Sequence, residues 1–166
     1  MGALIKLIDL TLFIFFFVIA LAAPLIDSQT CLPRHLFPTA LIDIKSWYGR
    51  EYGDYLIAEK PHFFVGLVWV ELLFQWPLAV ACLYGIAAGK SWLNTTCLLY
   101  GVSTSTAMVA ILSELTLSKR ASERLLTMYF PFLGFAILAI LRGLTSHAGK
   151  TMTIGKRPVL NRKKRA

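Results

Sequence analysis

The chain has 166 residues, of which 57% are hydrophobic and only 16% are charged, and its formal net charge is +8. This composition lies outside the range of ordinary soluble proteins and indicates a small membrane protein. Seven of the 17 basic residues follow Arg142, with no acid among them. Such a cluster directly after an apolar segment is typical of the cytosolic flank of a membrane span. No folded basic surface with interleaved aromatics accompanies it, so we expect no nucleic-acid partner.

Four apolar segments are long enough to cross a bilayer, whose core requires about 20 apolar residues in a helix. They are residues 7–26, 63–88, 94–115 and 125–144. We therefore predict an all-α, polytopic membrane protein with a four-helix transmembrane bundle in residues 1–148 and a basic cytosolic tail in residues 149–166. Gly85, Ala88 and Gly89 would permit close helix contact, including contact in a homodimer surrounded by membrane lipids.

The first segment has two interpretations. Lys6, the apolar stretch after it and Ala20-Leu21-Ala22 resemble a signal peptide with an A-x-A cleavage site, which would remove this helix. However, the apolar run from Leu10 is longer than the usual apolar region of a signal peptide, about 7 to 15 residues. We therefore expect the helix to be retained.

The first connection, residues 28–62, is far longer than the other two and combines aromatic with charged side chains. This mixture is suited to the membrane interface, where aromatic rings anchor. Leu41, Ile44 and Trp47 or Tyr48 recur at helical spacing, which predicts a short amphipathic helix. We expect the connection to form a cap over the lumenal end of the bundle.

The orientation follows from the charges. An even number of spans places both termini on one side of the membrane, and the basic tail indicates that this side is the cytosol. Lys90 in the second connection agrees, whereas Lys119, Arg120 and Arg124 in the third do not. The glycosylation sequon that begins at Asn94 would then face the cytosol, and we expect it to be unmodified.

The acids within the spans are the most informative residues. Asp9, Glu114 and Arg142 lie near the ends of their segments, where charged groups can reach the interface, but Glu71 lies deep, and Asp27 follows the first apolar run. A carboxylate in lipid is costly unless it faces a protein cavity, so an intramembrane acid indicates a candidate functional site.

The second and fourth spans also carry features that would form a cavity. Gln75 lies four residues after Glu71, on the same face of the helix and one turn deeper. Pro77 and Pro131 lack a backbone N–H, and kinks of this kind open space within a bundle and expose carbonyl acceptors. Together these features predict a polar-floored cavity between the helices.

Aromatic and hydroxyl side chains on the third and fourth spans have two readings. Tyr100 and Tyr129 are candidate cavity walls, because a buried ring with a polar tip suits a pocket, yet either could equally be a packing residue. The hydroxyls of residues 103–106 would serve close helix packing at least as readily as ligand contact. We expect no cofactor and no metal, and the three cysteines form no disulfide framework.

The chemistry of the pair follows from its surroundings. If Asp27 and Glu71 approach each other in a low-dielectric site, they cannot both ionise at low cost, so the pair should carry a single negative charge. That charge would attract a protonated amine, and the apolar walls would accept a flat hydrophobic body. The predicted ligand is a lipid-like or cationic amphiphilic molecule. The structural alternative is a hydrogen-bonded pair that only holds two helices together.

Several short motifs, in their order and spacing from about Pro24 to Leu144, resemble those of the sigma-2 receptor family, members of the EXPERA-domain group. They are Leu25-Ile26-Asp27, Leu32-Pro33-Arg34-His35-Leu36-Phe37-Pro38, Trp47-Tyr48, Glu51-Tyr52-Gly53-Asp54, Glu71-Leu72-Leu73-Phe74-Gln75-Trp76-Pro77 and Glu123-Arg124-Leu125. No single motif is specific, but their ordered combination is.

The resemblance implies a four-helix protein of the endoplasmic reticulum membrane that binds sterols and cationic amphiphilic drugs. It further implies a role in intracellular cholesterol transport, partly through the Niemann-Pick type C transporter. Matched by position, Asp27 would pair with a ligand amine, and Glu71 would be its hydrogen-bonding neighbour. The other implied roles are pocket walls at Gln75, Tyr100 and Tyr129, a structural acid supporting the cap at Asp54, and a cytosolic retrieval signal at Lys163 and Lys164.

The chain also departs from the family pattern. Phe132 stands at the position of a pocket tyrosine, Ala107 replaces a threonine, and Ile19 replaces a histidine on the first helix. These departures bear on drug selectivity, whereas the acidic positions are retained.

Two other functions remain open. The same group includes sterol Δ8-Δ7 isomerases, whose reaction needs an acid to protonate one carbon and a base to deprotonate another. Glu71 and Asp27 could supply these groups, but the isomerases carry a histidine one turn before the acid, where this chain has Leu67. We therefore favour binding over catalysis. The third hypothesis is a structural membrane adaptor whose basic tail recruits a partner.

Overall fold

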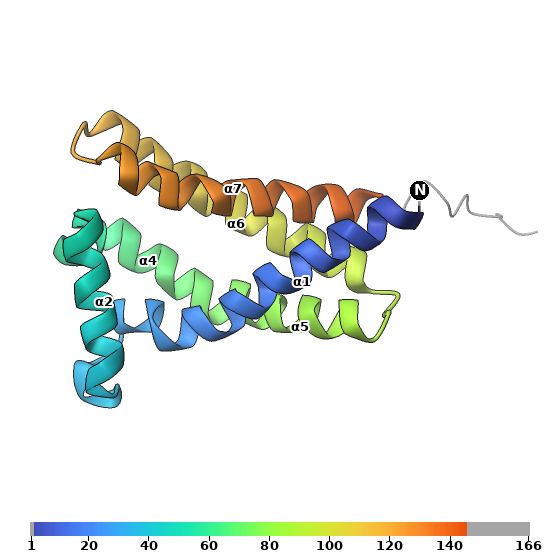
Figure 1. Ribbon diagram of the computed structural model, residues 1–166, viewed down its shortest axis with the longest axis horizontal. Coiled ribbons are helices and arrows are strands. Elements are labelled where there is room, and N and C mark those ends of the chain that lie inside the picture. Colours follow the sequence, from blue (N-terminus) through green and yellow to red (C-terminus); the bar gives the residue numbers. More distant parts are fainter. Residues whose placement is uncertain (1, 146–166) are drawn as a thin grey trace, which may run out of the picture.

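The computed structural model describes residues 2–145. The boundary at residue 148, the basic tail and the proposed retrieval signal at Lys163 and Lys164 lie outside the described residues. Within the described part all regular elements are helical (Figure 1). Four helical segments are long and apolar enough to span a membrane, and they are Gly2–Thr30, His62–Ala87, Leu93–Leu117 and Glu123–Leu144. The predicted fold class is thus confirmed.

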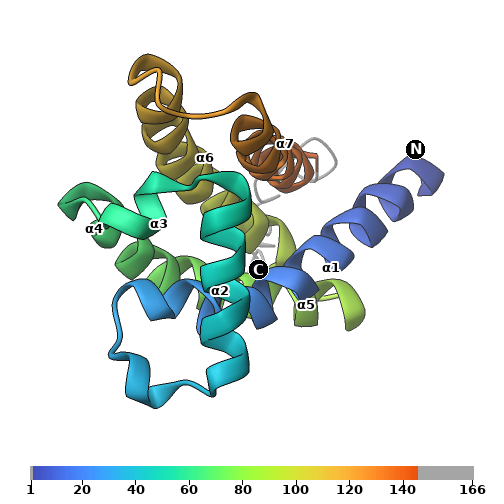
Figure 2. The same cartoon turned by 60° about the vertical axis from the view of Figure 1, so that its left-hand side comes forward.

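The bundle is built from six helical elements. They are α1 (Gly2–Leu25), α4 (His62–Val70), the π-helical turn η3 (Glu71–Gln75), α5 (Trp76–Ala87), α6 (Leu93–Leu117) and α7 (Glu123–Leu144). α6 and α7 run side by side along their length in both views (Figures 1 and 2). A Cβ placed on Gly101 would lie 2.7 Å from the Ala136 carbonyl oxygen, and one on Gly143 would lie 2.7 Å from that of Asn94. Glycine at these two positions lets the backbones of α6 and α7 approach closely.

Four short elements form the cap between the first two spans. They are η1 (Asp27–Thr30), η2 (Arg34–Leu36), α2 (Thr39–Tyr52) and α3 (Tyr55–Glu59). α2 lies across one end of the long helices (Figures 1 and 2). The Tyr55 hydroxyl joins this cap to α6, because it donates to Glu114 Oε1 at 3.1 Å and lies 2.9 Å from Ser118 Oγ. The predicted cap is therefore present.

The amphipathic helix predicted in the cap is present as α2. Ile44 and Trp47 are 53% and 55% exposed, whereas Lys45 is only 7% exposed. The Lys45 Nζ donates to the Ile26 carbonyl oxygen at 2.9 Å and to Thr30 Oγ1 at 2.7 Å. Because these acceptors satisfy the ammonium group, α2 turns Lys45 inward and leaves the two apolar side chains on the outside.

The second span changes helix type just before its proline. The N–H of Trp76 bonds to the carbonyl oxygen of Glu71, five residues earlier, which makes η3 a π-helical turn. Pro77 follows at once and supplies no N–H of its own, so the predicted irregularity occurs here. In contrast, α7 runs as one helix through Pro131, and the distortion expected there does not break the element.

Two of the charges near the ends of the spans, Asp9 and Arg142, pair with each other. Arg142 on α7 is only 8% exposed and forms an ion pair with Asp9 on α1. Its Nη2 lies 3.2 Å from Asp9 Oδ2, and its Nη1 donates to Asn94 Oδ1 at 2.6 Å. The pair therefore ties α1, α6 and α7 together inside the bundle. It also engages the side-chain carbonyl oxygen of Asn94, the first residue of the sequon.

Candidate functional site

A cavity of about 300 Å³ lies inside the bundle, next to the cap. Its lining draws on both apolar clusters of the core, one centred on α1, α5 and α6 and the other where α4, α6 and α7 meet the cap. The structure brings all the predicted ligand-binding residues to this cavity. They are Asp27, Glu71, Gln75, Tyr100, Tyr129 and Phe132.

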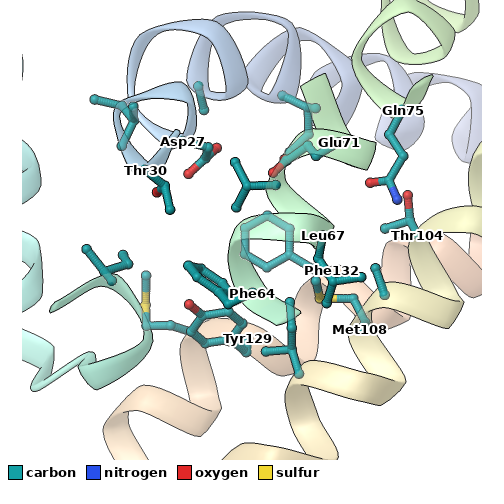
Figure 3. A pocket seen from close by; sticks show the side chains of 18 of the residues that line it. Asp27, Thr30, Phe64, Leu67, Glu71, Gln75, Thr104, Met108, Tyr129 and Phe132 are labelled. Atoms are coloured by element: carbon teal, nitrogen blue, oxygen red, sulfur yellow. The ribbon is translucent and has the colours of Figure 1, made fainter. Parts of the chain in front are cut away.

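The two acids come from points where regular helix geometry ends. Asp27 is the first residue of η1, directly beyond α1, and Glu71 is the first residue of the π-helical turn. Both side chains extend into the same space (Figure 3). Within residues 2–145, neither carboxylate accepts a hydrogen bond from a donor group and neither forms an ion pair. The hydrogen bond between the two acids stays a prediction.

Polar side chains one turn beyond Glu71 are fixed by contacts within the protein. Gln75 is 5% exposed and donates to Ser103 Oγ on α6 at 3.0 Å, and Thr104 lies beside it (Figure 3). This contact supports the predicted polar floor, and it also serves helix association. Gln75 therefore positions the second span against the third.

Tyr129 and Asp54 link the cavity wall to the cap. Asp54 is 1% exposed and caps α3, because its Oδ1 accepts from the backbone N–H groups of Leu56 and Ile57 at 3.1 and 3.3 Å. The Tyr129 hydroxyl on α7 donates to Asp54 Oδ2 at 2.7 Å. This network fits the structural role that the family resemblance implies for Asp54, and it means that the Tyr129 hydroxyl already has a partner.

Tyr100 is the most deeply enclosed of the aromatic walls. It is 2% exposed, and its ring meets those of Phe16 and Phe15 edge-on, with centroids 4.9 and 6.1 Å apart. Both earlier readings of this tyrosine therefore apply, since it belongs to the core cluster and also lines the cavity.

Lys45 is the residue that sequence reasoning missed. It lies behind the cavity wall, since its partner atoms belong to Ile26 and Thr30, which both line the cavity. Burial lowers the pKa of Lys45 to about 8, and the nearby Asp27 carboxyl partly opposes this effect. Helical spacing places Leu41, Lys45 and Tyr48 on one face of a helix, but this spacing does not show that Lys45 is buried.

The position that carries a histidine in the isomerases also faces the cavity. Leu67 is among its lining residues, whereas His35 and His62 are exposed and do not line it. The groups able to transfer protons at the cavity surface are thus the two carboxyls and the tyrosine hydroxyls.

Comparison with known proteins gives a family. Residues 40–143 match the family model of EXPERA (EXPanded EBP superfamily). Sigma intracellular receptor 2 of Homo sapiens and that of Macaca fascicularis are each 35% identical over 88 residues, which cover 52% of this chain and 50% of each relative. The aligned part of the chain thus spans half the length of these two relatives.

A third relative aligns over more of the chain. Sigma intracellular receptor 2 of Xenopus tropicalis is 26% identical over 159 residues, covering 88% of this chain and 93% of the relative. These matches confirm the resemblance to the sigma-2 receptor family. Because the family model covers more than half of the chain, this protein belongs to the EXPERA family.

Proposed function

We propose that this protein is a membrane receptor that binds sterols and cationic amphiphiles in its acidic cavity. The proposal rests on one observation: Asp27 and Glu71 enter an apolar cavity within the membrane-spanning helices without a donor or cation bound to either carboxylate in residues 2–145. Burying such carboxylates without partners costs free energy, and this cost arises when the protein folds. A ligand that neutralises them does not add that desolvation cost on binding, so its affinity is higher.

The walls specify the rest of the ligand. Besides aliphatic side chains, aromatic rings from several elements surround the acids, and they are Tyr48, Phe64, Tyr100, Tyr129 and Phe132. A protonated amine would pair with Asp27, and its hydrophobic body would extend between the rings. Glu71 would share a proton with Asp27 and help to hold the charge in place.

Leu67 at the cavity surface favours receptor function over isomerase function. Leu67 supplies no proton-transfer group at the position where the isomerases carry histidine, and the receptor names of the relatives point the same way. Complementation of a sterol-isomerase-deficient cell by this chain would overturn this choice.

Cell-level aspects of the proposal follow from the family resemblance. We place the protein in the endoplasmic reticulum membrane with both termini in the cytosol, where it would regulate sterol transport together with a Niemann-Pick type C transporter. A sequon inserted into the exposed cap tests the orientation, since the cap should be glycosylated if it is lumenal. Removal of residues 149–166 tests the adaptor alternative, which requires the tail and not Asp27.

Binding to the purified full chain tests the cavity itself. A fluorescent long-chain tertiary amine serves as probe, and Asp27→Asn should weaken its binding about 100-fold, since an ionic contact in a desolvated site is lost. Asp43→Asn, which changes an exposed acid of α2, is the matched control and should leave binding unchanged. Equal affinities of the parent and Asp27→Asn proteins would refute the amine site.

A further inference from the structure

A second cavity, of about 330 Å³, lies within the cap and has the opposite charge. Four basic side chains line it, and no acid is among its lining residues. They are Arg34, Lys45, Arg50 and Lys60, which come from η2, from α2 and from the residue after α3. Neither the proposed amine binding nor the family resemblance gives this cavity a role.

Two of these cations are held by the backbone. The Lys60 Nζ donates to the carbonyl oxygens of Gln29 and Thr30, each at 3.2 Å, and Lys45 bonds to that of Ile26. These carbonyls lie at the end of the first span, so the lysines stabilise a helix C-terminus and are fixed in position by it.

The two arginines are available. Neither Arg34 nor Arg50 forms an ion pair with any residue between 2 and 145. Two acids of the cap are engaged away from this cavity, because Glu51 pairs with Arg124 and Glu59 pairs with Arg120. No acid lines the cavity, and the nearby Asp27 and Asp54 carboxyls interact electrostatically with Lys45. The charges of the two arginines have no ion-pair partner in the described part of the chain.

We propose that this basic cavity binds a phosphate group. Arginine presents a fork of N–H donors that matches phosphate oxygens in paired hydrogen bonds, and the two fixed lysines add charge to the floor of the cavity. A carboxylate satisfies this arrangement less completely, since it carries one charge and two oxygens.

The phosphate could belong to a phospholipid headgroup or be free in solution, and the surroundings favour the lipid. The cap segment that carries the arginines also exposes large apolar side chains, which do not line the cavity themselves. They are Leu32 (36%), Leu36 (59%), Ile44 (53%) and Trp47 (55%). Such side chains enter the interfacial layer of a bilayer, which would bring lipid headgroups to the level of the arginines.

The two cavities are neighbours with separate chemistry. Ile57 lines both, and Lys45 reaches from the basic cavity toward the wall of the acidic one. Because the arginines line only the basic cavity, phosphate binding can be lost while amine binding is kept. The two proposals can therefore fail independently.

Binding of dioctanoyl phosphatidic acid to the purified full chain in an uncharged detergent provides the test, with dioctanoylglycerol as the lipid that lacks phosphate. The parent protein should bind the phosphatidic acid at least about tenfold more tightly than the diacylglycerol. The double variant Arg34→Gln/Arg50→Gln should lose about tenfold in affinity for phosphatidic acid and keep its affinity for the tertiary amine.

The matched control is Lys6→Gln/Lys119→Gln, which removes the same charge from two exposed residues that lie outside the cavity and form no ion pair within residues 2–145. It should leave phosphatidic acid binding within about twofold of the parent. Equal losses in both double variants, or none in either, would overturn the proposal.

Inorganic phosphate distinguishes the two sources. If it displaces phosphatidic acid at comparable concentrations, the site serves free phosphate; if a hundredfold excess is needed, as we expect, the site is built for a lipid. Both interpretations require that Arg34→Gln/Arg50→Gln weakens phosphatidic acid binding. If this variant binds phosphatidic acid as the parent does, the proposed phosphate site does not exist.

Discussion

Two groups of charged side chains lie within the membrane-spanning helices, at opposite ends of the bundle. At one end Arg142 meets Asp9 and Asn94, so charge and hydrogen-bonding capacity are matched inside the protein. At the other end Asp27 and Glu71 enter a cavity without a bound donor or cation among residues 2–145. The first group joins three helices, whereas the carboxylates of the second group have no ion-pair partner within the described residues.

The presence or absence of a partner distinguishes charges that stabilise the fold from charges that are available for ligand binding. Removing one member of a matched buried pair leaves the other without compensation and destabilises the fold. Removing a carboxylate that has no partner costs no such contact, so its loss should appear in binding and not in stability. The same Asp→Asn substitution should therefore have opposite consequences at the two ends.

Among the variants considered, Asp9→Asn should change the free energy of unfolding most. It leaves the guanidinium of Arg142 without its counter-charge and should lower the free energy of unfolding by about 3 kcal/mol, measured by thermal denaturation in detergent. Amine binding by the folded fraction should not change. Asp27→Asn, the matched control, should melt at or above the parent temperature. A loss of stability as large as that of Asp9→Asn would make Asp27 a structural acid.

Tyr129→Phe removes a hydrogen bond at the junction of cavity and cap. Asp54 is buried and would lose the 2.7 Å bond from the Tyr129 hydroxyl, which should cost about 1 to 2 kcal/mol of stability. Tyr48→Phe is the control, since Tyr48 lines the same cavity but forms no side-chain hydrogen bond within residues 2–145. Equal melting temperatures for the two variants would show that the Asp54 network does not hold the cap.

Glu71→Gln distinguishes the two acids of the cavity. Asp27 would remain as the ionic partner, so amine affinity should fall only about tenfold, less than in Asp27→Asn. Titration of the fluorescent amine into both variants measures this difference. A larger loss of amine affinity in Glu71→Gln than in Asp27→Asn would show that Glu71, and not Asp27, is the ionic partner of the amine.

Lys45, a buried cation between the two cavities, should make a smaller contribution, which appears as a change of stability with pH. Burial lowers the pKa of Lys45 to about 8 from its usual value of 10.5. Between these two values the unfolded chain binds more protons than the folded protein, so stability should rise with pH over this range. We expect a gain of order 1 kcal/mol that is missing from Lys45→Met.

Melting temperatures of the parent and the variant, recorded from pH 7.5 to 10, measure this gain as a difference. Groups that do not interact with Lys45 titrate alike in both proteins and cancel in the comparison. Parallel pH profiles would show that the Lys45 ammonium is not disfavoured by folding.

Much of the candidate site was predictable because its residues break local patterns. Glu71 and Gln75 are polar side chains in an apolar run, and Asp27 follows directly on another, so each stands out without knowledge of the fold. Lys45 did not stand out, because a lysine in a polar connection is ordinary. Its burial depends on the carbonyls of Ile26 and Thr30, which lie many residues earlier in the chain.

The four spans, the presence of the cap and the positions of the intramembrane acids can be predicted from the amino-acid sequence, since length and hydropathy act locally along the chain. Which charges are matched depends on how the helices pack. The packing paired Asp9 with Arg142, turned Lys45 inward, and left Asp27 and Glu71 facing a shared cavity. These outcomes depend on which helices meet and at what level, and contacts between residues far apart in the chain have no local sequence pattern to reveal them.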